Sequence, residues 1–130
     1  MIQEFVDRFM ENKAALRAEF EANEPGDYEE IVKAVVEAIS TDEVNSPDPN
    51  GVIEIPSNDC QGTNLYIIKN KYENEPYWAV MVHYGTCSGC DTLEGIKDNY
   101  YDDLSKRLDG YMTLALHIVQ KMKKLELDGV

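Results

Sequence analysis

The sequence predicts an α+β fold: a small antiparallel three-stranded sheet with two N-terminal helices and a long C-terminal helix, in the order ααβββα. Three observations predict it. Apolar residues recur at helical spacing over residues 2–40, three short apolar runs follow between 51 and 84, and helical spacing returns after residue 92. The length of 130 residues suits one domain, with an acidic helical part (1–40) and a part holding the sheet and the C-terminal helix (51–130).

The N-terminal part is predicted to form two amphipathic helices. Residues 2–22 place apolar side chains on one helical face, and the helix is expected to end at Asn23-Glu-Pro-Gly because proline and glycine break helices. Residues 27–40 carry a second apolar stripe. Asp27 is the predicted N-cap of this helix, and Glu30 stands three residues later as its capping-box partner.

A loop and three strands are predicted next. Residues 41–50 are polar, contain two prolines and are expected to form a mobile hinge between the helices and the sheet. The strands are predicted at 51–55, 64–69 and 77–84, with a hairpin loop at 70–76. Both faces of the third strand are largely apolar, which predicts a central strand that is buried on both sides.

The C-terminal part, from about residue 92 to 126, is predicted to be helical with an interruption in the polar run at 97–103. Asp91 or Thr92 is the expected cap at its start. Three lysines, Lys121, Lys123 and Lys124, are expected near the C-terminal end of this helix, where the helix dipole favours cations.

The charge of the chain narrows the classes of partner. The formal net charge is −13, which excludes ordinary nucleic-acid binding because that needs a basic surface. Residues 1–50 hold 13 acidic and 4 basic residues, so most of the excess lies in the helical part. Two interpretations stay open: solubility through self-repulsion, and a surface that binds a basic partner. The candidate partner-binding residues are Glu19, Glu21, Glu24, Asp27, Glu29, Glu30, Asp42 and Glu43.

A Cys-x-x-Cys motif, Cys87-Ser-Gly-Cys90, follows the third predicted strand and allows three interpretations. A strand that leads into this motif at a helix start is how thioredoxin-like proteins place a reactive thiolate. The 40 residues after Cys90 are predicted to be helical, however, so the later strands of that fold have no candidates. As a zinc site the motif supplies two of four ligands, which Cys60 or His83 could extend. The preferred interpretation is a tight turn built on Gly85 and Gly89.

Two motifs carry a resemblance. Asp59-Cys-Gln-Gly-Thr-Asn precedes the second strand, and Tyr84-Gly-Thr-Cys-Ser-Gly-Cys-Asp91 follows the third. The pair resembles small uncharacterised proteins of phages and bacterial mobile elements that carry D-x-Q-G-T and Y-G-S/T-C-S-G-C-D segments, over about residues 57–118. In that group the position of Cys60 is often tyrosine, which implies that Cys60 is not a required ligand. The resemblance implies a phage or mobile-element context and no mechanism.

The function that these observations favour is non-enzymatic. We expect a cytoplasmic protein in the host cell that binds a basic host protein, in one form a DNA-mimic, anti-CRISPR-like inhibitor of a nucleic-acid-binding enzyme. A zinc-binding module that uses Cys87 and Cys90, and a thiol redox protein, are the alternatives. No cofactor is expected unless zinc is bound. No signal-peptide core and no stretch of membrane-spanning length is visible, so no membrane partner is expected.

Overall fold

The computed structural model describes residues 2–41, 46–56, 63–71, 77–83 and 92–125. The helices are α1 (Ile2–Glu11), α2 (Lys13–Ala22), α3 (Tyr28–Ile39), α4 (Thr92–Asn99) and α5 (Leu104–Lys121). The strands are β1 (Pro47–Pro56), β2 (Thr63–Asn70), β3 (Tyr77–His83) and β4 (Lys123–Leu125). The predicted α+β class and antiparallel sheet are confirmed, but the described chain has three helices before the sheet and a fourth strand at its end.

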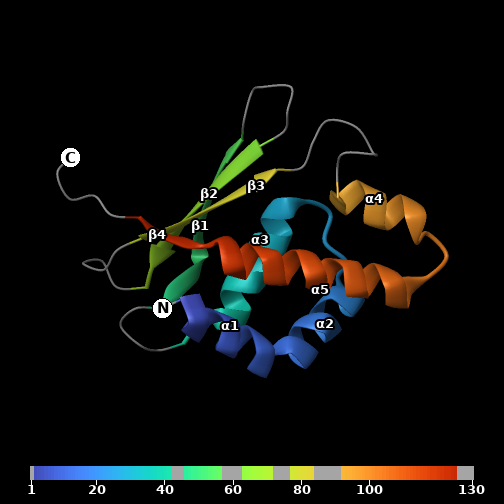
Figure 1. Ribbon diagram of the computed structural model, residues 1–130, viewed down its shortest axis with the longest axis horizontal. Helices are drawn as coiled ribbons and strands as arrows, with labels where there is room; N and C mark the ends of the chain where they lie inside the picture. Colours follow the sequence, from blue (N-terminus) through green and yellow to red (C-terminus); the bar gives the residue numbers. More distant parts are fainter. Residues whose placement is uncertain (1, 42–45, 57–62, 72–76, 84–91, 126–130) are drawn as a thin grey trace.

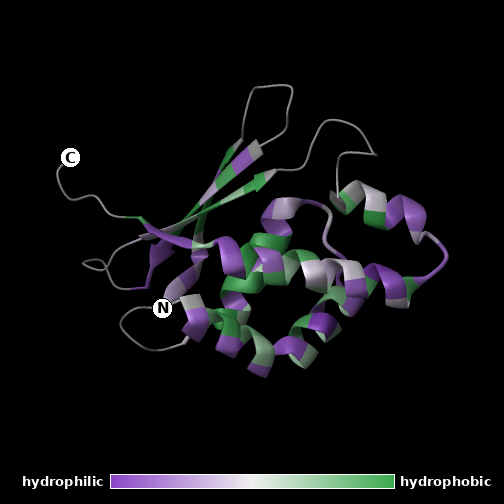
Figure 2. Cartoon of the chain, viewed as in Figure 1, coloured by the Kyte–Doolittle hydropathy of each residue, from purple (hydrophilic) through white to green (hydrophobic). Residues whose placement is uncertain are grey.

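The four strands form one antiparallel sheet in the order β1-β2-β3-β4. Helices α1, α3 and α5 pack against one face of this sheet, and α2 and α4 contact the other helices (Figure 1). Figure 2 shows hydrophobic residues along β3 and on the turns of α3 in the middle of the molecule, with hydrophilic residues in the connection between α4 and α5. The core therefore lies between the helical layer and one face of the sheet.

Alternation along the central strands explains which side chains enter this core. The buried apolar side chains of the inner sheet face are Tyr66 and Ile68 on β2 and Trp78, Val80 and Val82 on β3. Trp78 is fully buried and meets the ring of Phe5 from α1 edge to face, with ring centroids 5.4 Å apart. On α3, the stripe that was predicted from its spacing is buried at every position from Tyr28 to Ile39 where an apolar residue larger than alanine stands.

The first predicted helix is two helices, because the chain bends at Asn12. The side-chain amide Nδ2 of Asn12 donates to the carbonyl oxygen of Ala38 on α3 (2.8 Å) and to that of Arg8 (3.1 Å). The bend lets both halves bury aromatic residues, Phe5 and Phe9 on α1 and Phe20 on α2. Periodicity could not reveal the break, since Asn12 is pinned by a residue 26 positions away.

The predicted hinge over 41–50 is wrong for its second half; residues 42–45 lie outside the described part. Ser46 is buried, and its hydroxyl oxygen accepts from the backbone N–H of Thr41 (2.7 Å). β1 begins at Pro47, which pairs with Asn70 ahead of an irregularity in the register. Gly51 lies in this irregular stretch, where a Cβ would come within 2.8 Å of the Cβ of Lys69. Glycine therefore allows β1 to approach β2 closely.

The C-terminal helical part agrees with its prediction at the interruption and differs from it at the end. The expected interruption is confirmed, because α4 ends at Asn99 and α5 begins at Leu104 with Asp103 as N-cap (Oδ1 accepts from Lys106 N, 3.1 Å). The predicted C-terminal boundary of the helix is wrong, because α5 ends at Lys121 and Lys123–Leu125 pairs with β3. This segment could continue the helix or pair with the free edge of β3, and it pairs with β3. Helical spacing alone does not show which of the two conformations is formed.

The third predicted strand is central, between β2 and β4, but it is not buried on both faces. The side chain of Met81 on its outer face is 52% exposed. An apolar pattern on both faces of a strand does not say whether a second layer exists to cover the second face. In the described chain the packed helices cover only one face.

Candidate functional site

A groove runs between α2 and α3 on the acidic side of the molecule. Two adjoining hollows form it, of about 400 Å³ and about 270 Å³, and they share Glu19, Ala34 and Glu37. The floor of the larger hollow is built from small and apolar side chains (Ala15, Leu16, Ala34 and Ala38). Four glutamates (Glu19, Glu24, Glu30 and Glu37) and one lysine, Lys33, are the charged residues lining the two hollows.

The structure describes six of the eight candidate partner-binding residues, and three of them, Glu19, Glu24 and Glu30, line this groove. Glu19 and Glu21 lie on α2, Glu29 and Glu30 lie on the first turn of α3, and Glu24 and Asp27 lie in the connection between these helices. Asp42 and Glu43 are outside the described residues. Glu37, one helical turn beyond Lys33, lines both hollows but is absent from the predicted set. The alanines at positions 34 and 38, four apart on one helix face, were the available signal.

Several of these carboxylates already have local partners. The predicted N-cap is confirmed, because Asp27 Oδ1 accepts from Glu30 N (2.9 Å). The second half of the predicted capping box differs: Glu30 Oε2 accepts from the backbone N–H of Gly26, the residue before the N-cap, in place of that of Asp27. Glu29 pairs with Lys33 one turn along α3 (3.1 Å). Asp27 and Glu30 remain exposed, so they still contribute negative charge to the groove while they stabilise the start of α3.

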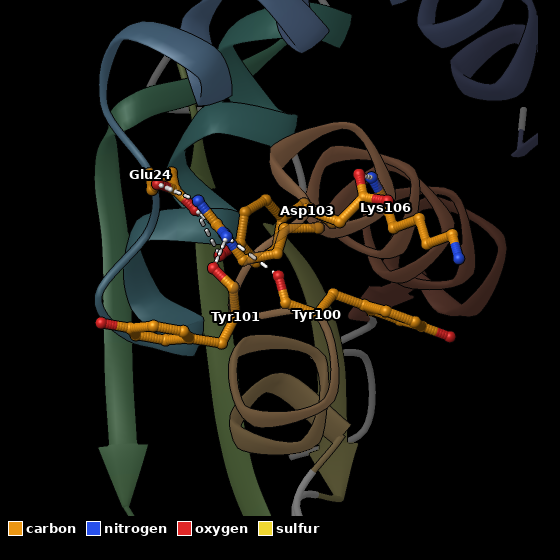
Figure 3. A network of polar contacts seen from close by, with 7 residues as sticks. Glu24, Tyr100, Tyr101, Asp103 and Lys106 are labelled. Atoms are coloured by element: carbon orange, nitrogen blue, oxygen red, sulfur yellow. Dashed lines mark hydrogen bonds and ion pairs between the residues drawn. The ribbon is translucent and has the colours of Figure 1, made fainter.

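Glu24 is held most firmly, in a network that sequence reasoning did not find (Figure 3). Arg107 on α5 binds its carboxylate with two nitrogens, Nε to Oε1 (2.8 Å) and Nη2 to Oε2 (3.3 Å). The hydroxyl of Tyr111 donates to the same Oε1 (2.9 Å). Arg107 Nη1 also donates to the carbonyl oxygens of Tyr100 (2.9 Å) and Tyr101 (2.6 Å). The network joins the α2–α3 connection, the α4–α5 turn and α5, which are more than 80 residues apart in the chain at their extremes.

The electrostatics of this network follow from its contacts. The hydrogen bond from Arg107 lowers the pKa of the Glu24 carboxyl, against a smaller opposing effect of burial. Burial, helped by the hydrogen bond to Glu24, raises the pKa of the Tyr111 hydroxyl to about 12. Glu24 is thus committed to holding the helical layer together.

The lowered pKa of Glu24 predicts how stability changes with pH. Its stabilising contribution is fully present above the unfolded-state pKa near 4.5 and is lost as the pH falls through the lower folded-state value. We expect Glu24→Gln to unfold at lower urea concentration than the wild type at pH 7, by about 1 kcal/mol or less, because the pair is partly exposed. The gap should shrink as the pH falls from 5 to about 3.

Urea unfolding curves at each pH, followed by circular dichroism, measure this gap. Glu4→Gln, at an exposed position on α1, controls for the general effect of removing one carboxylate. A gap at Glu24 that stays constant with pH, or that matches the gap at Glu4, would contradict the assignment.

One end of the sheet holds the described residues that border the two sequence motifs. Thr63, in the first motif, pairs with His83, which directly precedes the second motif. Beside this pair a buried polar chain runs across the strands: Asn64 Nδ2 donates to the Tyr66 hydroxyl (3.1 Å), which donates to Glu54 Oε2 (2.8 Å). Burial is the main cause that raises the pKa of Tyr66, so its hydroxyl stays a donor to Glu54. Asn64 Oδ1 is buried and accepts no hydrogen bond in the described structure.

The start of α4, the helix that follows the second motif, is anchored to α3. The hydroxyl oxygen of Tyr28, the first residue of α3, accepts from the backbone N–H of Leu93 at the start of α4 (2.9 Å). This buried bond joins residues 65 positions apart. The bond fixes the position of the first turn of α4 against the start of α3.

The cysteine interpretations concern residues that the structure does not describe. Cys60, Cys87 and Cys90 all lie outside the described residues, and so does the side chain of His83. Among the side chains that are described, no group of three or more His, Cys, Asp or Glu residues is arranged to hold a metal ion. Zinc binding and thiol chemistry at this motif therefore stay predictions.

No helix in the described ranges is both long and apolar enough to cross a membrane. Two regions are the candidate sites: the acidic groove between α2 and α3, whose floor includes alanines, and the end of the sheet that borders the two sequence motifs. No family model matches the chain, and searches of curated proteins and of solved structures find no significant match.

Proposed function

We propose that the protein is a non-enzymatic binding protein whose groove between α2 and α3 receives a basic segment of another protein. The observation that carries the proposal is the lining of the groove: four glutamates against one lysine, above a floor of alanines and Leu16. Small floor residues let a helix or an extended chain approach closely, and carboxylates at the rim pair with lysine or arginine side chains.

The proposal extends to the class of protein that the groove binds. With the resemblance to phage and mobile-element proteins, the acidic groove favours a basic host protein as partner, and a nucleic-acid-binding defence enzyme is the class whose surface is most basic. A DNA-mimic inhibitor of the anti-CRISPR type is the specific form proposed. In this form Glu19 and Glu37 take the place of phosphates, while Glu24 serves the fold through Arg107.

Affinity capture from a bacterial lysate tests the proposal. The baits are the wild type, a Glu19→Lys/Glu37→Lys variant, and a Glu4→Lys/Glu11→Lys variant that makes the same change of net charge on α1, outside the groove. We expect a basic protein to be captured at 50 mM salt by the wild type and the α1 variant. The groove variant should lose it, because reversed charges at the rim repel a basic segment.

Salt provides the second readout. Retention should fall steeply when the salt is raised toward 500 mM, because exposed charge pairs are screened. Equal capture by the two charge-reversed variants would show that overall charge, rather than the groove, holds the partner. Retention that does not depend on salt would contradict an electrostatic interface altogether.

A further inference from the structure

The outer face of the sheet is an apolar surface on the opposite side from the packed helices. The pairing of the strands sets its side chains in three rows across the sheet. The first row holds the pair Tyr77 and Leu125, with Gly51 beside Lys69 toward β1, the second is Ile53, Ile67, Ala79 and Lys123, and the third is Ile55, Leu65 and Met81. These three rows are called the outer face below. Ile53, Ile55 and Met81 are 43%, 45% and 52% exposed.

A cleft deepens one side of this surface. It holds about 440 Å³ and lies against β3 and β4, where Leu65, Ala79, Met81 and Leu125 contribute apolar walls. Lys121, Lys123 and Lys124 also line it, and no acidic residue is among its described lining residues. Exposed apolar surface of this kind marks interaction sites in folded proteins.

The charge of the outer face is opposite to that of the rest of the molecule. Within the three rows the charged residues are Lys69 and Lys123, with Lys121 and Lys124 beside them in the cleft. Asp48 stands near the far corner, beside Gly51 on β1. In a chain of net charge −13, this gathering of lysines around apolar residues selects a partner that is apolar and acidic.

The dimensions of the surface limit the form of this partner. Three alternate positions along a strand span about 13 Å, and four strands span about 14 Å, which gives a backbone footprint of about 180 Å². An α-helix with its side chains is about 10–12 Å wide, so one helix covers the face. Two copies joined through this face would bring the lysines of both faces together, and such like-charge contacts disfavour a dimer.

The sheet edges argue against the addition of a strand. β1 carries prolines at both ends (Pro47 and Pro56), and β4 has three residues, two of them lysines. Prolines, short length and lysines are the features that keep a sheet edge from pairing with another chain. The interaction is therefore with the face of the sheet.

We infer that the outer face binds a short acidic amphipathic helix of a partner protein, with one large apolar side chain in the cleft between β3 and β4. The bound helix would form a second layer on the sheet, and its carboxylates would meet Lys121 and Lys123. This surface is separate from the acidic groove, so the inference does not depend on the function proposed for that groove.

A display library tests the inference. Its 14-residue peptides have leucine or phenylalanine at positions i, i+3, i+4 and i+7, with glutamate, lysine, glutamine and serine varied at the rest. Selection is carried out against the immobilised wild-type protein. We expect the enriched peptides to contain more glutamate than lysine. No enrichment, or enrichment without an acidic excess, would overturn the inference.

Binding of an enriched peptide to variants, followed by fluorescence anisotropy, locates the site. Met81→Gln is expected to weaken binding about tenfold, the scale of losing a central apolar anchor. Lys121→Gln/Lys123→Gln should weaken it and reduce its dependence on salt. Met10→Gln is the matched control, because Met10 on α1 is exposed to the same extent (51%) and lies outside the outer face.

Thermal unfolding of each variant checks that the fold is retained, which is expected because all substituted side chains are exposed. Equal peptide affinity for Met81→Gln and Met10→Gln would overturn the inference. Concentration-dependent dimerisation of the wild type in sedimentation experiments, lost in Met81→Gln, would assign the face to a second copy and overturn it as well.

Discussion

Trp78→Ala is expected to lower the free energy of unfolding by about 3–5 kcal/mol, the largest effect of any single change considered for this chain. The indole is fully buried at the centre of the inner sheet face, where it contacts Phe5 from α1 edge to face. Its removal leaves a cavity between the sheet and the helical layer. Since domains of this size are stable by about 5–15 kcal/mol, the loss is a large fraction of the total.

Urea unfolding followed by circular dichroism measures this loss. Met81→Ala is the internal control, because Met81 lies three residues further along β3 on the outer face. Its effect is expected to stay within about 0.5 kcal/mol, as for other exposed substitutions. Similar losses at Trp78 and Met81 would mean that β3 is buried on both faces and that the outer face is covered.

Tyr28→Phe is expected to cost about 1–3 kcal/mol, because it leaves the buried N–H of Leu93 without its acceptor. The phenyl ring still fills the space of the tyrosine ring, so the change removes the hydroxyl and little packing. The effect should be concentrated in α4, whose start is anchored to α3 by this bond.

Hydrogen exchange is the discriminating measurement for Tyr28→Phe. The amide of Leu93 and its neighbours in α4 should exchange faster in the variant. The exchange rates of amides in β2 and β3 should change only as far as the global free energy of unfolding changes. Tyr101→Phe removes a hydroxyl from a side chain that is 78% exposed, and it should change neither quantity. Unaltered exchange at Leu93 in Tyr28→Phe would show that the bond does not anchor α4.

The outer face and the acidic groove give the molecule two surfaces of opposite charge. The groove lies between α2 and α3, and the outer face lies on the sheet side that no described helix covers. A basic segment and an acidic helix would therefore select different surfaces of the same protein. Charge reversal in the groove should leave peptide binding at the sheet unchanged, and substitution of Met81 should leave capture of the basic partner unchanged.

Local sequence signals predicted the parts of the fold that depend on neighbouring residues. The Asp27 N-cap and the apolar stripe of α3 need only four to twelve consecutive residues, and both are present. The central position of β3 also followed from its own apolar pattern. The acidic groove was predicted only as a cluster of charge. Its floor comes from two helices, and the sequence of neither helix alone shows how the two pack together.

Contacts distant in sequence decided the rest. The bend at Asn12 depends on the carbonyl of Ala38, and the role of Glu24 depends on Arg107 and Tyr111. The end of α5 depends on the open edge of β3, which draws Lys123–Leu125 into the sheet. In each case the local preference was weak, and a hydrogen bond or ion pair to a residue far along the chain settled the conformation.

The sequence by itself determined the α+β class, the amphipathic helices, the antiparallel strands and the acidic character of the N-terminal part. Only the tertiary structure decided which carboxylates are committed to the fold, which face of the sheet is covered, and where the lysines of the C-terminal part gather. The physical reason is that periodicity records which side of an element is apolar, while burial and charge pairing depend on what the rest of the chain brings to that side.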